Sequence, residues 1–526
     1  MQGDPEAKRI LSDVRDSSDE GKTVDYENAH IYKVRPEDDA RVRRKIDMVV
    51  LPMVRLYSTP QSTMISRLTI TDVPRLYAVP VQKHPENTTY ATIVFTQFLD
   101  KQSLAYASVY GLITDLKLTH HQFSWLTSCF FLSQLVSEWP FIYLMSRLPL
   151  AKFVGVTIII WGGICMCLAA PQNFAGFATV RCLLGFAEGA VSPAFITITS
   201  IWYRKNEHPL RVAMWVTCNG VAQIVGSLMM YGIGEQKLLT MAAWRVMFMV
   251  CGGITIFAGI LFLFAMPSGP EHAWFLDAEE RKIAAMRLAS EHDGGDKTDF
   301  SMKQFMEALT DQRTYLTFMF GLLVTMGSPV LTFVSLIIKG LGYTGGETLL
   351  YSSPSGAVQI AFVWLGVAGC WFYPNKRSLI VLLISIVPLV GCILLTVLPK
   401  STGWGKIVAA WLASVISSQF SILMSLSASN VRGNTKKAFV NAVFFVGYCT
   451  GGVAAPQLWT KPPRYLNGVI CALVNWCLVY VFVPYYWWTC RRENKRRDRL
   501  YGEGMGAFVA GADMTDKEDR AFRYTT

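Results

Sequence analysis

Five charged residues lie inside long apolar stretches of the 526-residue sequence, where a charge is costly to bury and therefore marks a candidate functional position. These residues are Asp100, Lys101, Glu138, Arg181 and Glu188. A guanidinium can hold a carboxylate through two parallel hydrogen bonds, so Arg181 is the candidate ligand for an anionic substrate. Because a low dielectric favours the neutral form of a carboxyl group, Asp100 and Glu188 are the candidate carriers of a coupling proton.

The same residues also permit structural interpretations, which the sequence leaves open. Arg181 could form an ion pair with either of the two candidate proton carriers instead of binding substrate. Lys101 could extend toward the membrane surface or pair with a neighbouring carboxylate. Glu138, and Arg147 at the end of the same stretch, are expected to act in gating or in structural ion pairs rather than in binding substrate.

Neutral polar residues recur at helical spacing on three otherwise apolar stretches. Residues four or seven positions apart share one face of a helix. We expect such a face to line a central cavity, although packing between helices explains polar pairs equally well. Besides Arg181, the candidate substrate-binding residues are Asn219, Gln223, Asn441 and Tyr448.

Apolar stretches of about 20 residues, the length of a membrane-crossing helix, occur in two sets separated by a polar segment. The sets cover 91–266 and 315–490 and have equal length, and we find no charged residue in the interior of the second set. The pattern predicts an all-α polytopic membrane protein with about twelve helices in two six-helix bundles. The predicted spans lie near 91–113, 124–146, 151–171, 174–200, 213–234, 244–266, 315–338, 349–371, 378–398, 407–428, 438–459 and 468–490.

Polar segments flank and join the two sets. Residues 1–90 are predicted to be a tail with an unusual polar insertion at 55–90, which is either a loosely packed segment or a retained intron. Residues 267–314 are predicted to be a linker with a helix near 277–288, and 491–526 a second tail. Lysine and arginine are more frequent in alternate loops, which predicts that both termini and the linker are cytoplasmic.

The composition excludes most other classes of protein. The chain is 52% hydrophobic and only 17% charged, and its net charge of +11 is concentrated in short runs beside apolar stretches, which indicates membrane anchoring rather than nucleic-acid binding. No phosphate-binding loop, nucleophile elbow or zinc-protease motif occurs, so neither an enzyme nor a cofactor is expected. The twelve cysteines are expected to be small packing residues rather than metal ligands.

Several short stretches between about Arg44 and Arg497, apart from 55–90, match a pattern found in one family. They include Phe98-Leu99-Asp100-Lys101, Glu138-Trp139-Pro140, Arg181-Cys182-Leu183-Leu184-Gly185, Glu188-Gly189-Ala190, Ile337-Ile338-Lys339-Gly340-Leu341-Gly342 and Arg492-Glu493-Asn494-Lys495-Arg496. In combination they resemble the fungal allantoate permease family of anion:cation symporters, within the major facilitator superfamily.

The resemblance implies a two-bundle fold with rocking of the bundles, and proton-coupled uptake of a small carboxylate at the plasma membrane. The expected partners are this anion, a proton and the lipid bilayer, and the chain is expected to be a monomer. The loop 373–377 departs from the family because it lacks the usual Asp-Arg, which weakens the expected inner gate. An exporter of a fungal metabolite and a non-transporting sensor or inactive paralogue are the alternatives; a proline-free stretch from Cys218 to Gly226 favours uptake.

Overall fold

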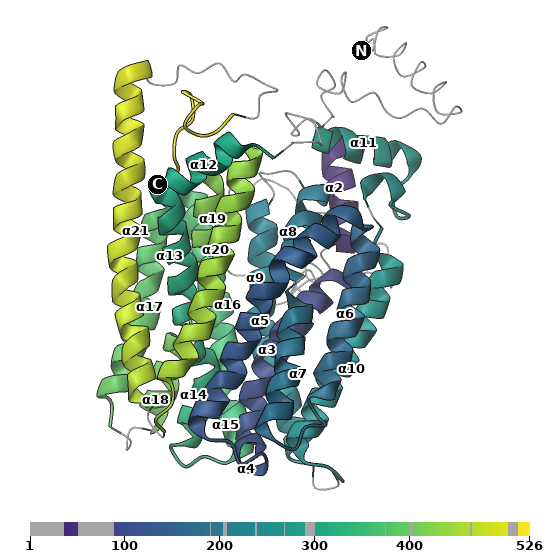
Figure 1. Ribbon diagram of the computed structural model, residues 1–526, viewed down its shortest axis with the longest axis vertical. Helices are drawn as coiled ribbons and strands as arrows, with labels where there is room; N and C mark the ends of the chain where they lie inside the picture. The colour runs from purple at the N-terminus through teal and green to yellow at the C-terminus, as the bar shows by residue number, and fades with distance from the viewer. Residues whose placement is uncertain are drawn as a thin grey trace, which may run out of the picture.

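The computed structural model describes residues 36–50, 89–189, 191–203, 208–236, 239–267, 269–289, 300–373, 375–399, 403–462, 465–502 and 514–526. These residues form α-helices and short 3₁₀ helices, with no strand among them. The long helices stand side by side in two bundles (Figure 1). The predicted all-α polytopic fold with two bundles is therefore confirmed.

The first bundle contains the helices that follow the insertion. Its helices are α3 (Thr89–Val109), α4 (Leu112–Asp115), α5 (His120–Arg147), α6 (Leu150–Cys167), α7 (Phe174–Glu188), α8 (Val191–Trp202), α9 (His208–Gly234) and α10 (Ala243–Ala265). Several of its spans are interrupted rather than continuous. The predicted span 174–200, for example, is divided into α7 and α8, which end and begin around Gly189.

The second bundle repeats this arrangement with more interruptions. Its helices are α13 (Gln312–Met326), α14 (Pro329–Lys339), α15 (Gly345–Ser352), α16 (Pro354–Phe372), α17 (Arg377–Val397), α18 (Gly403–Ala413), α19 (Ser417–Ser429), α20 (Asn434–Ala454), η6 (Ala455–Leu458) and α21 (Leu466–Tyr501). Pro329 and Pro354 begin new helices, because a proline lacks the N–H that would continue the preceding one.

Nine helical segments among the described residues are long and apolar enough to cross a membrane on those criteria alone. They include α6, α9 and α10 of the first bundle and six segments of the second. The remaining long helices, α3, α5 and α7 with α8, lie among them (Figure 1). These three carry all five charges that the sequence singled out. The first bundle, which is the less apolar of the two, is therefore the one in which we expect the functional residues.

The two bundles contact each other through helices α3, α5 and α9 of the first bundle. Helix α9 packs on α15, α16 and α19, α5 packs on α20 and η6, and α3 packs on α14 and α15. Gly220 of α9 faces Gly356 of α16 so closely that a Cβ on Gly356 would lie 2.3 Å from the Gly220 carbonyl oxygen. Side chains at these two positions would hold the bundles apart, so both glycines are needed for this contact.

Cross-bundle hydrogen bonds lie at the end where α3, α9 and α14 finish. Lys339 of α14 donates from Nζ to the Val109 carbonyl oxygen of α3, at 2.6 Å. Gln457 of η6 donates to the Ser128 hydroxyl of α5 at 2.7 Å, and that hydroxyl donates to the Val453 carbonyl oxygen at 2.7 Å. We call this end of the molecule the closed end.

Shorter helices lie at the opposite end, with the C-terminal residues 514–526 (Figure 1). They are α2 (Pro36–Val50), η4 (Pro270–His272), α11 (Ala278–Ala289) and α12 (Met302–Thr310). The helix predicted near 277–288 is thus present as α11. It holds α2 through ion pairs, Arg287 with Asp39 at 2.6 Å and Glu280 with Lys45 at 2.7 Å. We call this end the terminal end.

Three sequence-based expectations need further comment. Most of the insertion at 55–90 lies outside the described residues, and the proposed domain boundaries stay predictions. The twelve cysteines, all of them among the described residues, form no disulfide. The second bundle holds buried charge outside the interiors of the predicted spans, since Lys406 is 5% and Lys436 is 1% exposed. Both residues lie near helix ends, where the sequence pattern had indicated loops.

Candidate functional site

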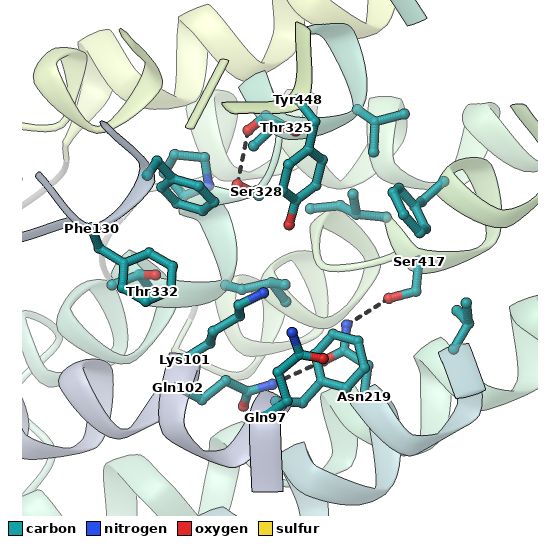
Figure 2. Close-up of a pocket in the computed structure, with 18 of the residues that line it drawn as sticks. Gln97, Lys101, Gln102, Phe130, Asn219, Thr325, Ser328, Thr332, Ser417 and Tyr448 are labelled. Carbon is teal, nitrogen blue, oxygen red and sulfur yellow. Dashed lines mark hydrogen bonds between the residues drawn. The ribbon is translucent and has the colours of Figure 1, made fainter. Parts of the chain in front are cut away.

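A cavity of about 240 Å³ lies between the two bundles (Figure 2). Its lining residues come from α3, α5, α7, α8 and α9 on one side and from α13, α14, α19 and α20 on the other. Two of the residues that line it are charged, Lys101 and Arg181, and both are cations. Among the described residues, no acidic side chain lines this cavity. The remaining wall is mostly aromatic and aliphatic, as in sites that bind small molecules.

Lys101 forms the strongest polar contact at the cavity wall. Its ammonium lies 2.9 Å from Glu188 Oε1, and Gln97 donates to the same oxygen at 3.0 Å. The Lys101 side chain is 20% exposed, whereas Glu188 is fully buried, and its Oε2 has no hydrogen-bond partner. The cation therefore faces the cavity, and its counter-ion lies behind it in the bundle.

Arg181 also reaches the cavity but without an ion pair. It is 3% exposed, and its Nε has no hydrogen-bond partner. Among the described residues, no carboxylate lies within 4.0 Å of its guanidinium, so the alternative pairings with Glu188 or Asp100 are not formed in this structure. Arg181 thus retains hydrogen-bonding capacity for an anion.

Two glycines bring Arg181 and Glu188 into position. A Cβ on Gly185 would lie 2.2 Å from the Phe130 carbonyl oxygen, and one on Gly189 would lie 2.0 Å from Ser137 Oγ. Helix α7 can therefore pack directly on the backbone of α5. Since Arg181 and Glu188 are about two turns apart on α7, this close packing fixes both beside the cavity.

Asp100 lies next to Lys101 in the sequence but on another face of α3. It is fully buried and is absent from the cavity lining. The Thr255 hydroxyl of α10 donates to its Oδ2 at 3.3 Å, and Oδ1 has no partner. Asp100 therefore points into the first bundle, while Lys101 points between the bundles.

A chain of neutral side chains crosses the cavity floor from one bundle to the other (Figure 2). Gln102 donates to Asn219 at 3.0 Å, Asn219 donates to Ser417 at 2.8 Å, and Ser417 donates to Gln359 at 3.1 Å. Asn219 was predicted from its spacing, but Gln102 and Ser417 were not. Ser417 begins α19 immediately after an interruption, which the continuous span predicted at 407–428 had concealed.

Tyr448 of α20 lines the cavity opposite Lys101 (Figure 2). Its ring contacts those of Phe131 and Phe420, with centroids 5.9 and 5.8 Å away. Phe131 belongs to the first bundle and Phe420 to the second. This aromatic group could therefore respond to movement of one bundle against the other.

Besides Asp100 and Glu188, four predicted residues lie away from the cavity lining. Gln223 is 4% exposed and lies against Gly356 at the contact between the bundles, and Asn441 is half-buried on α20. Glu138 is 8% exposed, and Arg147 is exposed, with its guanidinium 5.6 Å from the Tyr143 ring centroid. Among the described residues, no three histidine, cysteine or acidic side chains gather as a metal site requires.

Comparison with known proteins gives a family and a fold. Residues 90–456 match the family model of the Major Facilitator Superfamily. The chain is 30% identical to allantoate permease of Saccharomyces cerevisiae, over 95% of this chain and 89% of that protein. It is 33% identical to an uncharacterized transporter of Schizosaccharomyces pombe, over 99% and 98%. The D-xylose-proton symporter has a similar fold, with a TM-score of 0.56 at 12% identity, over 75% of this chain and 97% of that one.

Proposed function

The chain belongs to the Major Facilitator Superfamily and is a membrane transporter, and from this premise we propose that it takes up a small organic anion together with a proton. The observation that carries the proposal is the charge of the cavity wall: both charged residues that line it are cations. An anion entering the cavity would find Arg181 unpaired and Lys101 partly exposed. A carboxylate suits these two donors better than a neutral or cationic solute does.

Proton coupling follows from the charge balance of the site. Lys101 and Arg181 are balanced by Asp100 and Glu188, so the four ionised groups together are neutral. A bound carboxylate adds one negative charge in a region of low dielectric, where an uncompensated charge is costly. One proton on Asp100 or Glu188 restores neutrality. Asp100 is the better candidate because Lys101 and Gln97 already stabilise ionised Glu188.

The relatives support an organic anion in particular. Allantoate permease is named for a carboxylate, and its similarity extends over nearly the whole chain. We further propose that the protein works as a monomer in the plasma membrane with its terminal end in the cytoplasm. The division into a tail (1–90), two bundles (91–266 and 315–490), a linker (267–314) and a second tail (491–526) belongs to the same proposal. In this orientation the closed end faces outward.

Uptake of radiolabelled carboxylates by yeast lacking its own permeases tests the anion site. The variant Arg181→Lys keeps the charge but loses the two parallel hydrogen bonds. A charge-assisted hydrogen bond contributes ~1.5–3 kcal/mol, so we expect substrate affinity to fall roughly 10- to 100-fold. Arg491→Lys is the matched control, since Arg491 is an exposed arginine on α21 away from the cavity. Normal uptake by Arg181→Lys at normal surface expression would refute the anion-binding role.

The proton carrier is tested by the pH dependence of uptake. In Asp100→Asn the side chain can no longer exchange a proton, so uptake should no longer rise with external acidity. An unchanged pH profile in this variant would assign coupling to Glu188 instead. The variant Glu188→Gln would then be the one that loses the pH dependence.

A further inference from the structure

The C-terminal residues 514–526, which we call the strap, lie on the terminal end of the second bundle (Figure 1). Three of their side chains are almost inaccessible to solvent: Thr515 and Asp516 are each 1% exposed, and Tyr524 is 3% exposed. Polar side chains of a loosely attached tail normally stay in water. The strap is therefore packed as part of the bundle.

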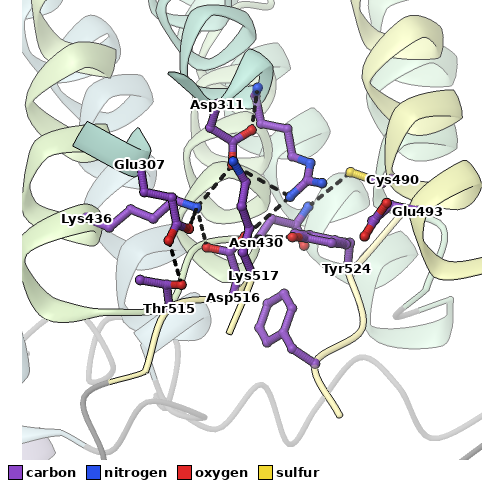
Figure 3. Close-up of polar contacts among 12 residues, drawn as sticks. Glu307, Asp311, Asn430, Lys436, Cys490, Glu493, Thr515, Asp516, Lys517 and Tyr524 are labelled. Carbon is purple, nitrogen blue, oxygen red and sulfur yellow. Dashed lines mark hydrogen bonds and ion pairs between the residues drawn. The ribbon is translucent and has the colours of Figure 1, made fainter. Parts of the chain in front are cut away.

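Asp516 anchors the strap to two helices of the bundle (Figure 3). Its carboxylate lies 2.7 Å from Lys436 Nζ of α20 and 3.3 Å from Arg313 of α13. Glu307 of α12 lies 2.8 Å from the same ammonium of Lys436. One residue of the strap thus completes a buried cluster to which three separate helices contribute. Asp311 also lies 3.0 Å from Lys436 Nζ, so the bundle itself supplies two carboxylates to this ammonium, and the ion pairs of Asp516 with Lys436 and Arg313 attach the strap to the same cluster.

Tyr524 reinforces the same anchor. Its hydroxyl donates to Asp516 at 2.6 Å, and its ring lies 3.6 Å below the guanidinium carbon of Arg313. Burial raises the pKa of the Tyr524 hydroxyl well above its usual range, so the group stays a neutral donor. The side chain gives the strap both an apolar contact and a cation–π contact.

The bundle also contacts the backbone of the strap, and these contacts fix its conformation. Arg497 of α21 donates to the carbonyl oxygens of Asp516 at 2.9 Å, Asp519 at 3.1 Å and Phe522 at 2.9 Å. These three bonds require a compact turn of the strap, because one rigid guanidinium makes all of them.

The end of the strap is held by an amide side chain. Asn430, which follows α19, donates to the Thr525 carbonyl oxygen at 2.9 Å and accepts from the Thr525 N–H at 2.7 Å. The side chain of Asn430 thus pairs with both backbone groups of one residue, as a neighbouring strand would. We call Arg313, Asn430, Lys436 and Arg497 the socket.

We propose that the socket is a binding site for a peptide that presents an aspartate and a tyrosine to it, occupied here by the strap of the same chain. We further propose that its occupation holds α12, α13, α20 and α21 together as one rigid body. The socket matches this ligand class in three ways: cations face Asp516, arginines contact the ring of Tyr524, and side-chain donors contact the backbone. This proposal does not depend on the nature of the transported solute.

The test uses the full chain with a specific protease site placed between Gly502 and Met514. After cleavage of the purified protein in detergent, we expect residues 514–526 to remain bound through size-exclusion chromatography. Excess synthetic peptide of residues 514–526 should displace them. A peptide with Asp516→Asn should need an at least tenfold higher concentration to displace the cleaved strap. A peptide with Arg520→Gln is the matched control and should compete normally, since Arg520 is exposed.

Hydrogen exchange of the cleaved protein then tests the mechanical role. After excess peptide has displaced the strap, the protein is diluted so that the peptide dissociates as well and the socket is empty. Hydrogen exchange should then rise in α12 and in the first turns of α20, and adding the peptide back should reverse this rise. Immediate loss of the fragment after cleavage, or equal competition by the Asp516→Asn peptide, would overturn the binding site. Unchanged exchange in both helices after displacement would overturn the rigid-body role.

Discussion

The Lys101–Glu188 ion pair allows the charge balance of the site to be tested separately from transport. The two groups are 2.9 Å apart, which at an effective dielectric constant of about 20 corresponds to a Coulomb attraction of ~6 kcal/mol. Desolvation offsets part of this attraction, and breaking a buried pair from one side costs ~3–5 kcal/mol. We therefore expect Lys101→Met to lower the free energy of unfolding by about that amount.

The two single variants should differ because the partners differ in burial. Lys101→Met leaves Glu188 charged and fully buried, whereas Glu188→Gln leaves Lys101 with 20% of its side chain exposed at the cavity. The second variant should therefore be the less destabilised. In the double variant no uncompensated charge remains, so its stability should return to within ~1–2 kcal/mol of the wild type.

Equilibrium unfolding in mixed micelles measures these differences, and uptake assays follow them in parallel. The double variant should be stable but inactive, because its cavity has lost one of two cations. Arg496→Met is the matched control: its pair with Glu493 is 2.8 Å long, close to the length of the Lys101–Glu188 pair, but 66% of the arginine side chain is exposed, so the change should cost less than ~1 kcal/mol. A double variant as unstable as Lys101→Met, or one with full uptake, would refute the reasoning.

Three further predictions concern the contacts between the bundles and the strap. A Cβ on Gly220 would lie 2.5 Å from Ile360 Cγ1, so Gly220→Leu should keep the bundles apart and abolish uptake at normal surface expression; retained uptake would argue against this contact closing during transport. Lys339→Gln shortens a side chain whose ammonium bonds the end of α3, so a cysteine in the cavity should be labelled faster by a membrane-impermeant reagent added from the closed end. A hydrogen bond from Lys303 lowers the pKa of Glu518. Ionised Glu518 should therefore help to hold the strap at any pH above the usual glutamate pKa, and this contribution should be lost as the pH falls through the lowered pKa. In Glu518→Gln the retention of the cleaved strap should depend less on pH.

The sequence was sufficient for the arrangement of the helices. Apolar stretches of the right length have no stable alternative to the membrane, so an all-α membrane fold in two bundles was predictable, while nine of the described helical segments meet the length and hydropathy criteria for a span. The interruptions within the helices were harder to predict, because a hydropathy window averages over residues such as Ser328 and Gly189. These interruptions decide which side chains reach the cavity. Ser417 was overlooked for this reason, although α19 begins with it.

For the site, the sequence predicted which charged residues lie inside the helices, but it predicted less well which residue each of them contacts. Arg181, Asn219 and Tyr448, which were predicted to bind substrate, line the cavity, and so does Lys101, which was predicted to serve in gating or in an ion pair. Spacing alone could not tell that Gln223 lies against Gly356 of the other bundle, since it places Gln223 on the same face of α9 as Asn219. Which carboxylate pairs with Lys101 depends on the packing of α3 on α7, and no local pattern encodes it.

The strap was predicted only as a polar tail, and two of its residues carried a signal that could have indicated more. Thr515 and Glu518 have the spacing of a capping box, and their side chains do cap a single turn, with bonds of 3.2 and 3.0 Å to each other's N–H groups. Tyr524 is an aromatic residue in a charged segment, which favours docking over solvation. Neither signal identifies the partner, because Lys436 and Arg497 lie in helices that the pattern treats as membrane spans or loop edges.

The buried charges of the two bundles therefore serve different purposes. In the first bundle they lie behind the cavity, where Lys101 and Arg181 face a solute and a proton can adjust the balance. In the second bundle Lys436 and Arg313 lie at the terminal end, and their acidic partners are Glu307, Asp311 and Asp516 of the strap. Under the proposed function, the first bundle changes its charge when it takes up the proton, while the charges of the second bundle stay paired. The proposed coupling then requires that the first bundle respond to the proton and that the second move as a rigid unit.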